Sequence, residues 1–409
     1  MQLSTFLASI TTLTAILAAP LAADDAKDIS SLTDAHTRFA LSLYPILDTS
    51  DTNLVFSPYS IATCLSMVYL GARGDTESQM ESTLHLDIDR KVIAKTAFSL
   101  SQSLSPQKNK ENGYQLNMAN AVWVDQGTFL LSDFRYAIVE QFKAKLSLLN
   151  FSQPASAAQT INDWISSQTQ NKIQNLLSAN DITPLTRLIL VNAVYFKGAW
   201  SFPFNPKVTQ DWPFHPTPDT TTTVKMMQQT SSIPYFENEL AQMAALPFEG
   251  IANNGGELAL VVLLPKSSDN FSKMSQELPD SLKDWISSLK PERINLKLPK
   301  FSLSSRFDLG APLQKLGMED AFDSDANFTG IDGMRDLYLN KVVHEAVLDL
   351  DENGVTAAAA TAAAIFATGF PKEPPILMNV DHPFLFFIVD LKSQEMLFMG
   401  KMAQPGTQK

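Results

Sequence analysis

Residues that could bind a metal ion are few, and the best match among them is incomplete. The stretch "DLDENG" fits the first half of a calcium-binding loop through Asp349, Asp351, Asn353 and Gly354. The twelfth position of such a loop needs a glutamate that binds through both oxygens, and Ala360 stands there. The sequence therefore predicts no calcium site, and we expect neither a metal nor another cofactor.

Side chains that could perform catalysis are also dispersed. The five histidines are His36, His85, His215, His344 and His382. No nucleophile-elbow GxSxG, phosphate-binding glycine loop or zinc-binding HExxH motif accompanies them. The one cysteine, Cys64, lies in the apolar stretch "SIATCLSMVYL", which is typical of a buried structural thiol and not of a reactive one. The sequence therefore predicts a protein that is not an enzyme.

Composition and charge argue against several classes of partner. The 409 residues are 45% apolar and 18% charged, and the formal net charge is −12. The densest basic stretch, "KNKENG", has only two lysines beside a glutamate, whereas nucleic acids and heparin-like polysaccharides need a clustered basic face. After residue 23 no apolar run approaches the roughly 18 residues of a membrane span. We expect no nucleic acid, no heparin-like cofactor and no membrane partner.

The amino-terminal segment differs from the rest of the chain. Residues 3–23, "LSTFLASITTLTAILAAPLAA", are apolar or small and contain no charge. This pattern is typical of a secretory signal peptide cleaved near Ala19 or Ala23, although the positive residues that usually come first are missing. A frayed amphipathic lead-in is the alternative. We expect 1–23 to be a signal peptide and 24–409 to be a single secreted domain.

Three Asn-X-Ser/Thr sequences would carry surface glycans in a host that glycosylates secreted proteins. They begin at Asn150, Asn270 and Asn327. The motif is short and common by chance, so it predicts where glycans would be attached and not that they are present.

Two helices are predicted near the start of the chain. Apolar residues three or four positions apart occur at Leu32, Ala35, Phe39 and Leu43, and again at Ile61, Leu65 and Val68. The second run opens with Ser57-Pro58, where serine can cap a helix and proline fits its first position.

From about residue 115 the sequence favours strands. Short apolar or alternating runs bounded by Pro, Gly or Asn occur at "LNMANAVWV", "LILVNAVYF", "LALVVLLP" and "INLKLPKFSL". They do not alternate regularly with helices, no internal repeat is visible, and no linker divides the chain. The sequence therefore predicts an α+β fold in one large domain.

A predicted strand near the carboxyl end leads into an alanine-rich segment. In "LYLNKVVHEAVLDL", residues 337–350, one face is formed by Val342, His344, Ala346, Leu348 and Leu350. The next segment, "GVTAAAATAAAIFATGF", has eight alanines, which favour a helix, but a helix this short is marginal. A flexible linker is the other ordinary interpretation, and it does not explain why Lys, Glu and Ser are absent from 355–370.

Five stretches, taken in order, resemble the signature segments of the serpins. They are "VFSPYSIATCLSMVYLGARGDTESQM", "INDWISSQTQNKIQNLL", "LVNAVYFKGAWSFPF", "HEAVLDLDENGVTAAAATAA" and "DHPFLFFIVDLKSQEMLFMGKM". The resemblance runs from about residue 30 to 405 and implies three β-sheets, eight or nine helices and an exposed reactive loop at about 354–375. One departure is Asn171, where the family usually has glycine; asparagine is the residue that best replaces glycine at positive φ.

The resemblance also implies a function. Serpins inhibit serine proteases as suicide substrates: the protease cuts the reactive loop, and the loop inserts into the main sheet before the acyl-enzyme is hydrolysed. We therefore expect a metastable chain that is a monomer in its active form and makes a covalent complex with its target protease. The alternative is a non-inhibitory serpin that acts as a carrier, storage protein or chaperone.

The alanine-rich segment has the side chains that insertion requires. A strand entering a sheet places alternate side chains in a packed interior, and this set would be Val355, Ala357, Ala359, Thr361, Ala363 and Ile365. A Lys or Asp in the set would carry an unpaired charge into a low-dielectric site, which costs several kcal/mol. The resemblance implies a hinge of the inhibitory type, formed by Gly354, Val355, Thr356, Ala357, Ala358, Ala359, Ala360 and Thr361.

The family's spacing from the hinge glycine indicates where the protease cuts, and several bonds remain open. It places the scissile bond between Thr368 and Gly369, where threonine would suit an elastase-like protease. Cleavage after Phe370 would suit a chymotrypsin-like protease, and cleavage after Lys372 a trypsin-like one. Residues 365–367 are further alternatives.

Two groups of residues match family positions that control insertion. The first group matches the family's polar cluster beneath the sheet that opens, and it consists of Ser57, Ser60, Asn192 and His344. The second group matches the family positions where the loop first enters the sheet. It consists of Trp200, Glu352 and Lys300 in "LPKF", which would be the ion-pair partner of Glu352. The ordinary interpretations are a helix cap for Ser57 and a satisfied core histidine for His344, and these can coexist with roles in opening.

Overall fold

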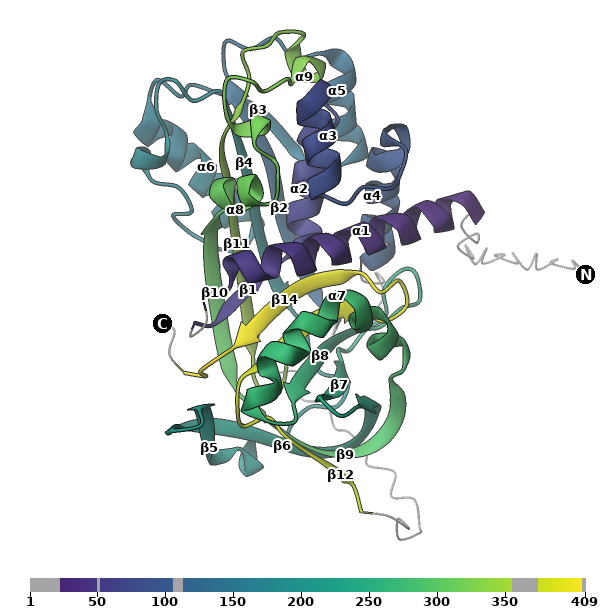
Figure 1. Ribbon diagram of the computed structural model, residues 1–409. Coiled ribbons are helices and arrows are strands. Elements are labelled where there is room, and N and C mark those ends of the chain that lie inside the picture. The colour runs from purple at the N-terminus through teal and green to yellow at the C-terminus, as the bar shows by residue number, and fades with distance from the viewer. Residues whose placement is uncertain (1–22, 50–51, 106–112, 355–373, 407–409) are drawn as a thin grey trace, which may run out of the picture.

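The computed structural model describes residues 23–49, 52–105, 113–354 and 374–406, and Figure 1 shows how their helices and strands are arranged. The α-helices in these ranges are α1 (Ala23–Leu47), α2 (Pro58–Tyr69), α3 (Gly74–Thr83), α4 (Arg90–Leu104), α5 (Ser132–Tyr136), α6 (Pro154–Gln168), α7 (Phe271–Ser287), α8 (Gly310–Lys315) and α9 (Thr329–Asp332). Short π or 3-10 turns are η1 (Ala137–Gln141), η2 (Ala179–Asp181), η3 (Pro206–Val208), η4 (Ser268–Asn270) and η5 (Asp320–Phe322). The expected α+β class and the expected eight or nine helices are confirmed.

The two predicted amino-terminal helices are present. In α1 the residues that set the period are all buried, namely Leu32, Ala35, Phe39 and Leu43. Helix α2 begins at Pro58, and the Oγ of Ser57 accepts the backbone N–H of Ser60 at 3.2 Å. Serine thus satisfies one of the donors that a helix start leaves free. Among the helices described here, none is long and apolar enough to span a membrane.

A five-stranded sheet runs through the upper and middle parts of the molecule in Figure 1. Its order is β10 (Phe301–Asp308), β11 (Leu339–Leu350), β4 (Leu188–Lys197), β2 (Gln115–Asp125) and β3 (Lys145–Leu149). Strands β11 and β4 are parallel and directly paired. All of β4 except its last residue is buried, which explains its continuous apolar sequence, since both faces of the sheet are covered.

The remaining strands form a nine-stranded sheet in the lower half of Figure 1. Its order is β1 (Leu54–Phe56), β14 (Met396–Met402), β13 (Phe384–Asp390), β8 (Leu258–Pro265), β7 (Ala241–Pro247), β6 (Thr220–Glu237), β9 (Lys290–Pro299) and β12 (Ile376–Asn379), with β5 (Gln210–Thr217) paired to β6. The resemblance implied three sheets, whereas the described strands form two. The reason is that β6 continues without a break, pairing with β5 and β9 and then, at its end, with β7.

The stretch "INLKLPKFSL", predicted as one run, is divided between the two sheets. Strand β9 ends at Pro299 and β10 begins at Phe301. Between them the backbone N–H of Lys300 donates to the Lys225 carbonyl at 2.8 Å. Lys300 is therefore the joint between the nine-stranded and the five-stranded sheet.

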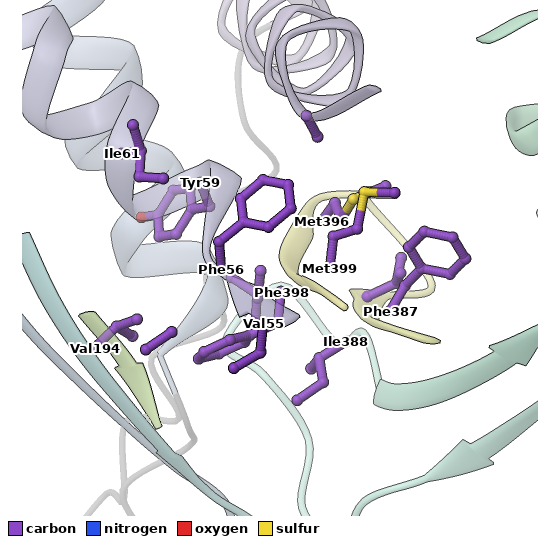
Figure 2. Packing of buried hydrophobic residues seen from close by; sticks show 14 of the residues in the cluster. Val55, Phe56, Tyr59, Ile61, Val194, Phe387, Ile388, Met396, Phe398 and Met399 are labelled. Carbon is purple, nitrogen blue, oxygen red and sulfur yellow. The ribbon is translucent and has the colours of Figure 1, made fainter. Parts of the chain in front are cut away.

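Both faces of the five-stranded sheet are packed. The larger core lies between this sheet, α1, α2 and the nine-stranded sheet, and Figure 2 shows Phe56, Tyr59, Val194, Phe387 and Phe398 converging from five different elements. A second buried cluster joins the opposite face to α6 and to the linker that follows it. A strand that entered this sheet would therefore meet packed side chains on both sides.

Candidate functional site

A row of side chains crosses the centre of the five-stranded sheet. Phe307 on β10, His344 on β11, Asn192 on β4 and Asn120 on β2 are successive cross-strand neighbours. His344 is 0% exposed and Asn192 1%, and the Phe307 and His344 rings stack with centroids 6.5 Å apart. We call Asn120, Asn192 and His344 the polar row. Polar side chains at such depth require hydrogen-bond partners.

The amino-terminal end of α2 supplies those partners. The Nε2 of His344 accepts the backbone N–H of Ser57 at 3.0 Å, so this nitrogen carries no proton. Its Nδ1–H donates to the side-chain oxygen of Asn192. The amide nitrogen of Asn192 donates to Ser60 Oγ and to the Asn120 oxygen, and Ser60 Oγ donates to the same Asn120 oxygen at 3.2 Å. The two partners of His344 thus select one tautomer of a neutral ring.

The charge state of His344 follows from its surroundings. Burial lowers its pKa from 6.5 to about 3, and the hydrogen bond with Asn192 only partly opposes this effect. At neutral pH the network is uncharged and satisfied, so strands could separate and exchange hydrogen bonds without exposing a charge to the core. The structure therefore brings together the four residues expected from the resemblance, which are Ser57, Ser60, Asn192 and His344.

Asn120 is a member of this network that the sequence did not reveal. The available signal was one of the two asparagines in the alternating stretch "LNMANAVWV". Only the antiparallel register of β2 and β4 places Asn120 beside Asn192. Cross-strand register depends on the whole fold, so a sequence pattern within β2 could not predict this contact.

Trp200 holds the turn that follows β11. Its ring Nε1–H donates to the Asp351 carbonyl at 2.8 Å, and its backbone N–H donates to the Asn353 carbonyl at 3.2 Å. The side chain is 3% exposed and stacks on Phe248, with ring centroids 4.7 Å apart and planes inclined by 11°. Two hydrogen bonds therefore hold the turn over residues 351–354 against Trp200, and the stacking on Phe248 holds the Trp200 ring in place.

Gly354 ends this turn in a conformation that other residues avoid. Its φ is 90°, and its N–H donates to the Asp351 carbonyl at 3.1 Å. A Cβ at this position would lie 2.3 Å from the Gly198 oxygen and 2.7 Å from Ala199 Cα. Positive φ and this close approach both require glycine. The first residue of the predicted hinge is therefore held by local geometry.

Glu352 and Lys300 form an ion pair beside the turn. The Lys300 Nζ lies 2.8 Å from Glu352 Oε2, and the side chains are 44% and 10% exposed, respectively. Burial acts to raise the pKa of Glu352, but the hydrogen bond and charge of Lys300 help to hold it below the ordinary 4.5. The backbone N–H of Phe204 donates to the Glu352 carbonyl at 2.8 Å. Trp200, Lys300 and Glu352 thus lie together, as the resemblance implied.

Comparison with known proteins identifies the family to which these features belong. The sequence profile described as "Serpin (serine protease inhibitor)" matches residues 34–405. The chain belongs to the serpin family. The resemblance inferred from the sequence is confirmed, and a family of protease inhibitors fits the expectation that the chain is not an enzyme.

Individual relatives cover nearly the whole serpin domain. Leukocyte elastase inhibitor of Bos taurus is 38% identical over 394 residues, which is 92% of this chain and 100% of the relative. Serpin48 of the insect Tenebrio molitor has a TM-score of 0.79 at 29% identity, over 92% of this chain and 98% of that one. Human thyroxine-binding globulin, solved with thyroxine, has a TM-score of 0.81 at 26% identity, over 92% and 99% of the two chains.

The predicted reactive bond of this serpin lies outside the described residues. The same holds for hinge residues 355–361, for Thr368 and Gly369, and for the alternatives at 365–367, Phe370 and Lys372. The described chain resumes at residue 374 and forms β12, which is parallel to β9. The structure therefore places the two points between which the predicted loop runs.

Asn171 adopts the conformation expected for a residue that replaces glycine in serpins. Its φ is 60°, and the preceding Gln170 has a φ of 53°. The Asn171 backbone N–H donates to the Ser166 carbonyl at 2.8 Å, and its side-chain oxygen accepts from Ser166 Oγ at 2.9 Å. Hydrogen bonding thus stabilises a left-handed turn that asparagine tolerates.

The other candidate residues have structural surroundings. Burial raises the pKa of Cys64 to about 12, so the thiol is unreactive. Asp349 contacts Ser302 and Asp351 accepts the Asn353 N–H, and no group of three metal-ligating side chains converges anywhere in the described ranges. The sequon residues Asn150, Asn270 and Asn327 are all partly exposed.

Proposed function

We propose that this serpin inhibits a serine protease as a suicide substrate, by inserting its cleaved loop between β4 and β11. The observation that carries this proposal is the junction between these strands. They are parallel neighbours, from Leu188 beside Leu339 to Phe196 beside Leu348. Because the chain reverses in the turn that ends at Gly354, a segment returning along the junction would run antiparallel to both strands.

A segment inserted there would have backbone hydrogen-bond partners on both edges and packed side chains on both faces. It would replace the hydrogen bonds between β4 and β11 with two antiparallel ladders. Alternate side chains would enter the core beside the polar row, and the others would lie under α6 and its linker. The alternate set that begins at Val355 and ends at Ile365 has no charged residue. Burial of this set therefore stabilises the inserted form without leaving an unpaired charge.

The chemical step is that of an ordinary serine protease substrate. The protease serine attacks the carbonyl carbon of Thr368, and its proton passes through the protease histidine to the departing amine of Gly369. The Thr368–Gly369 bond breaks and an ester joins Thr368 to the protease. Insertion of residues 355–368, which span roughly 46 Å when extended at about 3.3 Å each, then competes with hydrolysis of the ester.

The class of protease is part of the same proposal. Thr368 would suit the small primary pocket of an elastase-like enzyme, and the names of relatives such as leukocyte elastase inhibitor support this choice. A chymotrypsin-like enzyme acting after Phe370 is the next candidate. We propose that the active form is a monomer that works without a cofactor, and the net charge of −12 supports the absence of a heparin-like accelerator.

We also propose that the chain is secreted after removal of residues 1–23. The apolar, uncharged start of the chain supports this proposal. Glycans would then be attached at Asn150, Asn270 and Asn327, whose partial exposure is compatible with modification. Mass spectrometry of the natural protein tests both points, and an intact amino terminus starting at Met1 would contradict secretion by this route.

A carrier function is the alternative proposal. The similarity to thyroxine-binding globulin favours it, as does a cavity of about 380 Å³ between α1 and α7 that is lined by Leu41, Leu278, Leu282 and Lys283. Small-molecule sites in proteins are apolar hollows of this order with a few polar groups. This alternative predicts that proteases cut the loop without being trapped.

One experiment separates these functions. The purified chain is incubated with elastase, chymotrypsin, subtilisin and trypsin, and the products are separated on a denaturing gel. We expect a covalent complex with an elastase-like enzyme and a released carboxyl-terminal peptide that begins at Gly369. If every protease only cuts the loop, and the thermal stability does not rise after cleavage, inhibition by insertion is wrong and the carrier function takes its place.

A further inference from the structure

Lys172 contacts both strands that would have to separate. It lies in the linker between α6 and β4, residues 169–187. Its Nζ is 3.7 Å from Asp349 Oδ2 at the end of β11 and 5.4 Å from the centre of the Tyr195 ring on β4. Tyr195 is the cross-strand neighbour of Val347 on β11. The two contacts of this one ammonium group are therefore on opposite sides of the junction, at the end nearest Gly354.

We propose that Lys172 holds the junction between β4 and β11 closed and thereby sets the rate of loop insertion. This inference rests on the proposed function, because it concerns the opening of the same strands. Lys172 forms an ion pair with the Asp349 carboxylate and a cation–π contact with the face of the Tyr195 ring. An inserted strand would move β4 and β11 apart by a further strand spacing of about 4.8 Å. Lys172 could not keep both contacts across that distance, so insertion must break at least one of them.

The backbone around Lys172 is held in place. The left-handed turn at Gln170 and Asn171 precedes it, and the Lys172 N–H donates to the Thr169 carbonyl at 3.0 Å. The following residue, Ile173, is 0% exposed and belongs to the cluster under α6. The side chain of Lys172 itself is 47% exposed. A fixed backbone thus directs a side chain that can leave its contacts when the strands move.

The other end of the linker is attached differently. Asp181 in η2 lies 3.1 Å from the Lys341 Nζ on β11 and 3.5 Å from an Arg306 nitrogen on β10. Both of these strands lie on the same side of the junction. Asp181 could therefore move with β10 and β11 as a unit when the junction opens. Lys172 crosses the junction, and it does so where the proposed insertion begins.

The test measures opening without a protease. A labelled peptide with the sequence of residues 355–368 is incubated with the intact protein, and its rate of incorporation is followed together with the thermal stability. For Lys172→Ala we expect incorporation about 3- to 10-fold faster than in the unaltered protein, because exposed ion pairs and cation–π contacts are each worth less than a factor of about ten. Lys172→Arg keeps both types of contact and should restore a rate close to the unaltered one.

The chain offers a matched control. Lys143 also has an ion pair, with Glu140 at 3.1 Å, and a cation–π contact, with Phe98 at 6.0 Å, but both lie outside the five-stranded sheet. Lys143→Ala should leave the incorporation rate unchanged. An equal acceleration in both alanine variants, or none in Lys172→Ala, overturns the inference. If the rate of peptide incorporation changes in the Lys172 variants as expected but no protease is trapped, the proposed inhibition fails and the role of Lys172 in opening stands.

Discussion

His344 on β11 lies opposite Asn192 on β4, and the hydrogen bond between their side chains crosses the junction that the proposed insertion would open. The second ring nitrogen of His344 accepts from the Ser57 backbone N–H. A proton added to this nitrogen would break that contact and place a charge in the core. The network that spans the junction therefore depends on a neutral imidazole.

The native form should lose stability below pH 6.5 through His344. Its pKa is about 3 in the folded chain and 6.5 ordinarily, so between these values the unfolded chain binds a proton that the folded chain does not. This protonation costs the folded chain almost nothing above pH 6.5, and it lowers the free energy of unfolding by about 2 kcal/mol at pH 5. Urea unfolding of the unaltered chain and of His344→Gln at pH 7 and pH 5 measures it. The difference between the two proteins should shrink by about 2 kcal/mol at pH 5, and a constant difference would show that His344 does not titrate in this way.

Asn120 should contribute to stability as a member of the polar row. In Asn120→Ala the Asn192 amide and the Ser60 hydroxyl lose a shared acceptor, which should lower the free energy of unfolding by about 1–3 kcal/mol. Asn117 on the same strand is the control, because its buried amide nitrogen has no hydrogen-bond partner in the described part of the chain. Asn117→Ala should cost clearly less. Equal losses in the two variants would mean that the polar row has no special role.

Reversing the charge of Lys300 should make the native form less durable. Lys300→Glu places a second carboxylate beside Glu352, whose side chain is only 10% exposed, so the turn before the hinge is repelled from the sheet. We expect spontaneous polymerisation or loss of inhibitory activity to speed up several-fold on storage, as native gels and activity assays would show. The control is Lys225→Glu, since Lys225 pairs with Asp211 at the same 2.8 Å but both side chains are 63% exposed. An unchanged rate in Lys300→Glu would contradict the predicted role.

A charge in the alternate set of the hinge should abolish inhibition but not cleavage. Ala357→Arg would have to carry a guanidinium into the core during insertion, which slows that step while the ester is hydrolysed at its usual rate. We expect the variant to be a substrate that leaves little complex resistant to denaturing detergent. Thr356→Arg belongs to the other alternate set and should have the smaller effect. Wild-type stoichiometry in Ala357→Arg would refute insertion of this set.

Local patterns sufficed for much of the fold. The spacing of Leu32, Ala35, Phe39 and Leu43 predicted a helix, and Ser57-Pro58 predicted where α2 begins, because both signals act within a few residues. The strands were visible for the same reason. Their division between sheets was not, since nothing within "INLKLPKFSL" indicates that the chain changes sheets at Lys300.

The candidate site was predicted only where the family resemblance supplied positions. Ser57, Asn192 and His344 are far apart in sequence, and no pattern within one strand brings them together. Asn120 and Lys172 were missed because their roles depend on cross-strand register and on the path of the linker after α6. Both are tertiary properties, which sequence periodicity does not contain.

The attachment of β12 to β9 brings the two ends of the predicted reactive loop to the same part of the nine-stranded sheet. Strand β12 pairs with β9 from Ile376 beside Ile294 to Asn379 beside Lys297, and Lys300, just beyond β9, holds Glu352 next to the hinge. Both ends of the predicted reactive loop are thus fastened to one short stretch, 294–300. While the loop is continuous, its movement along the sheet would have to break one of these attachments. In the proposed function, cutting one peptide bond changes permanently which strands are neighbours, so each molecule would keep a lasting record of a single encounter and could serve only once.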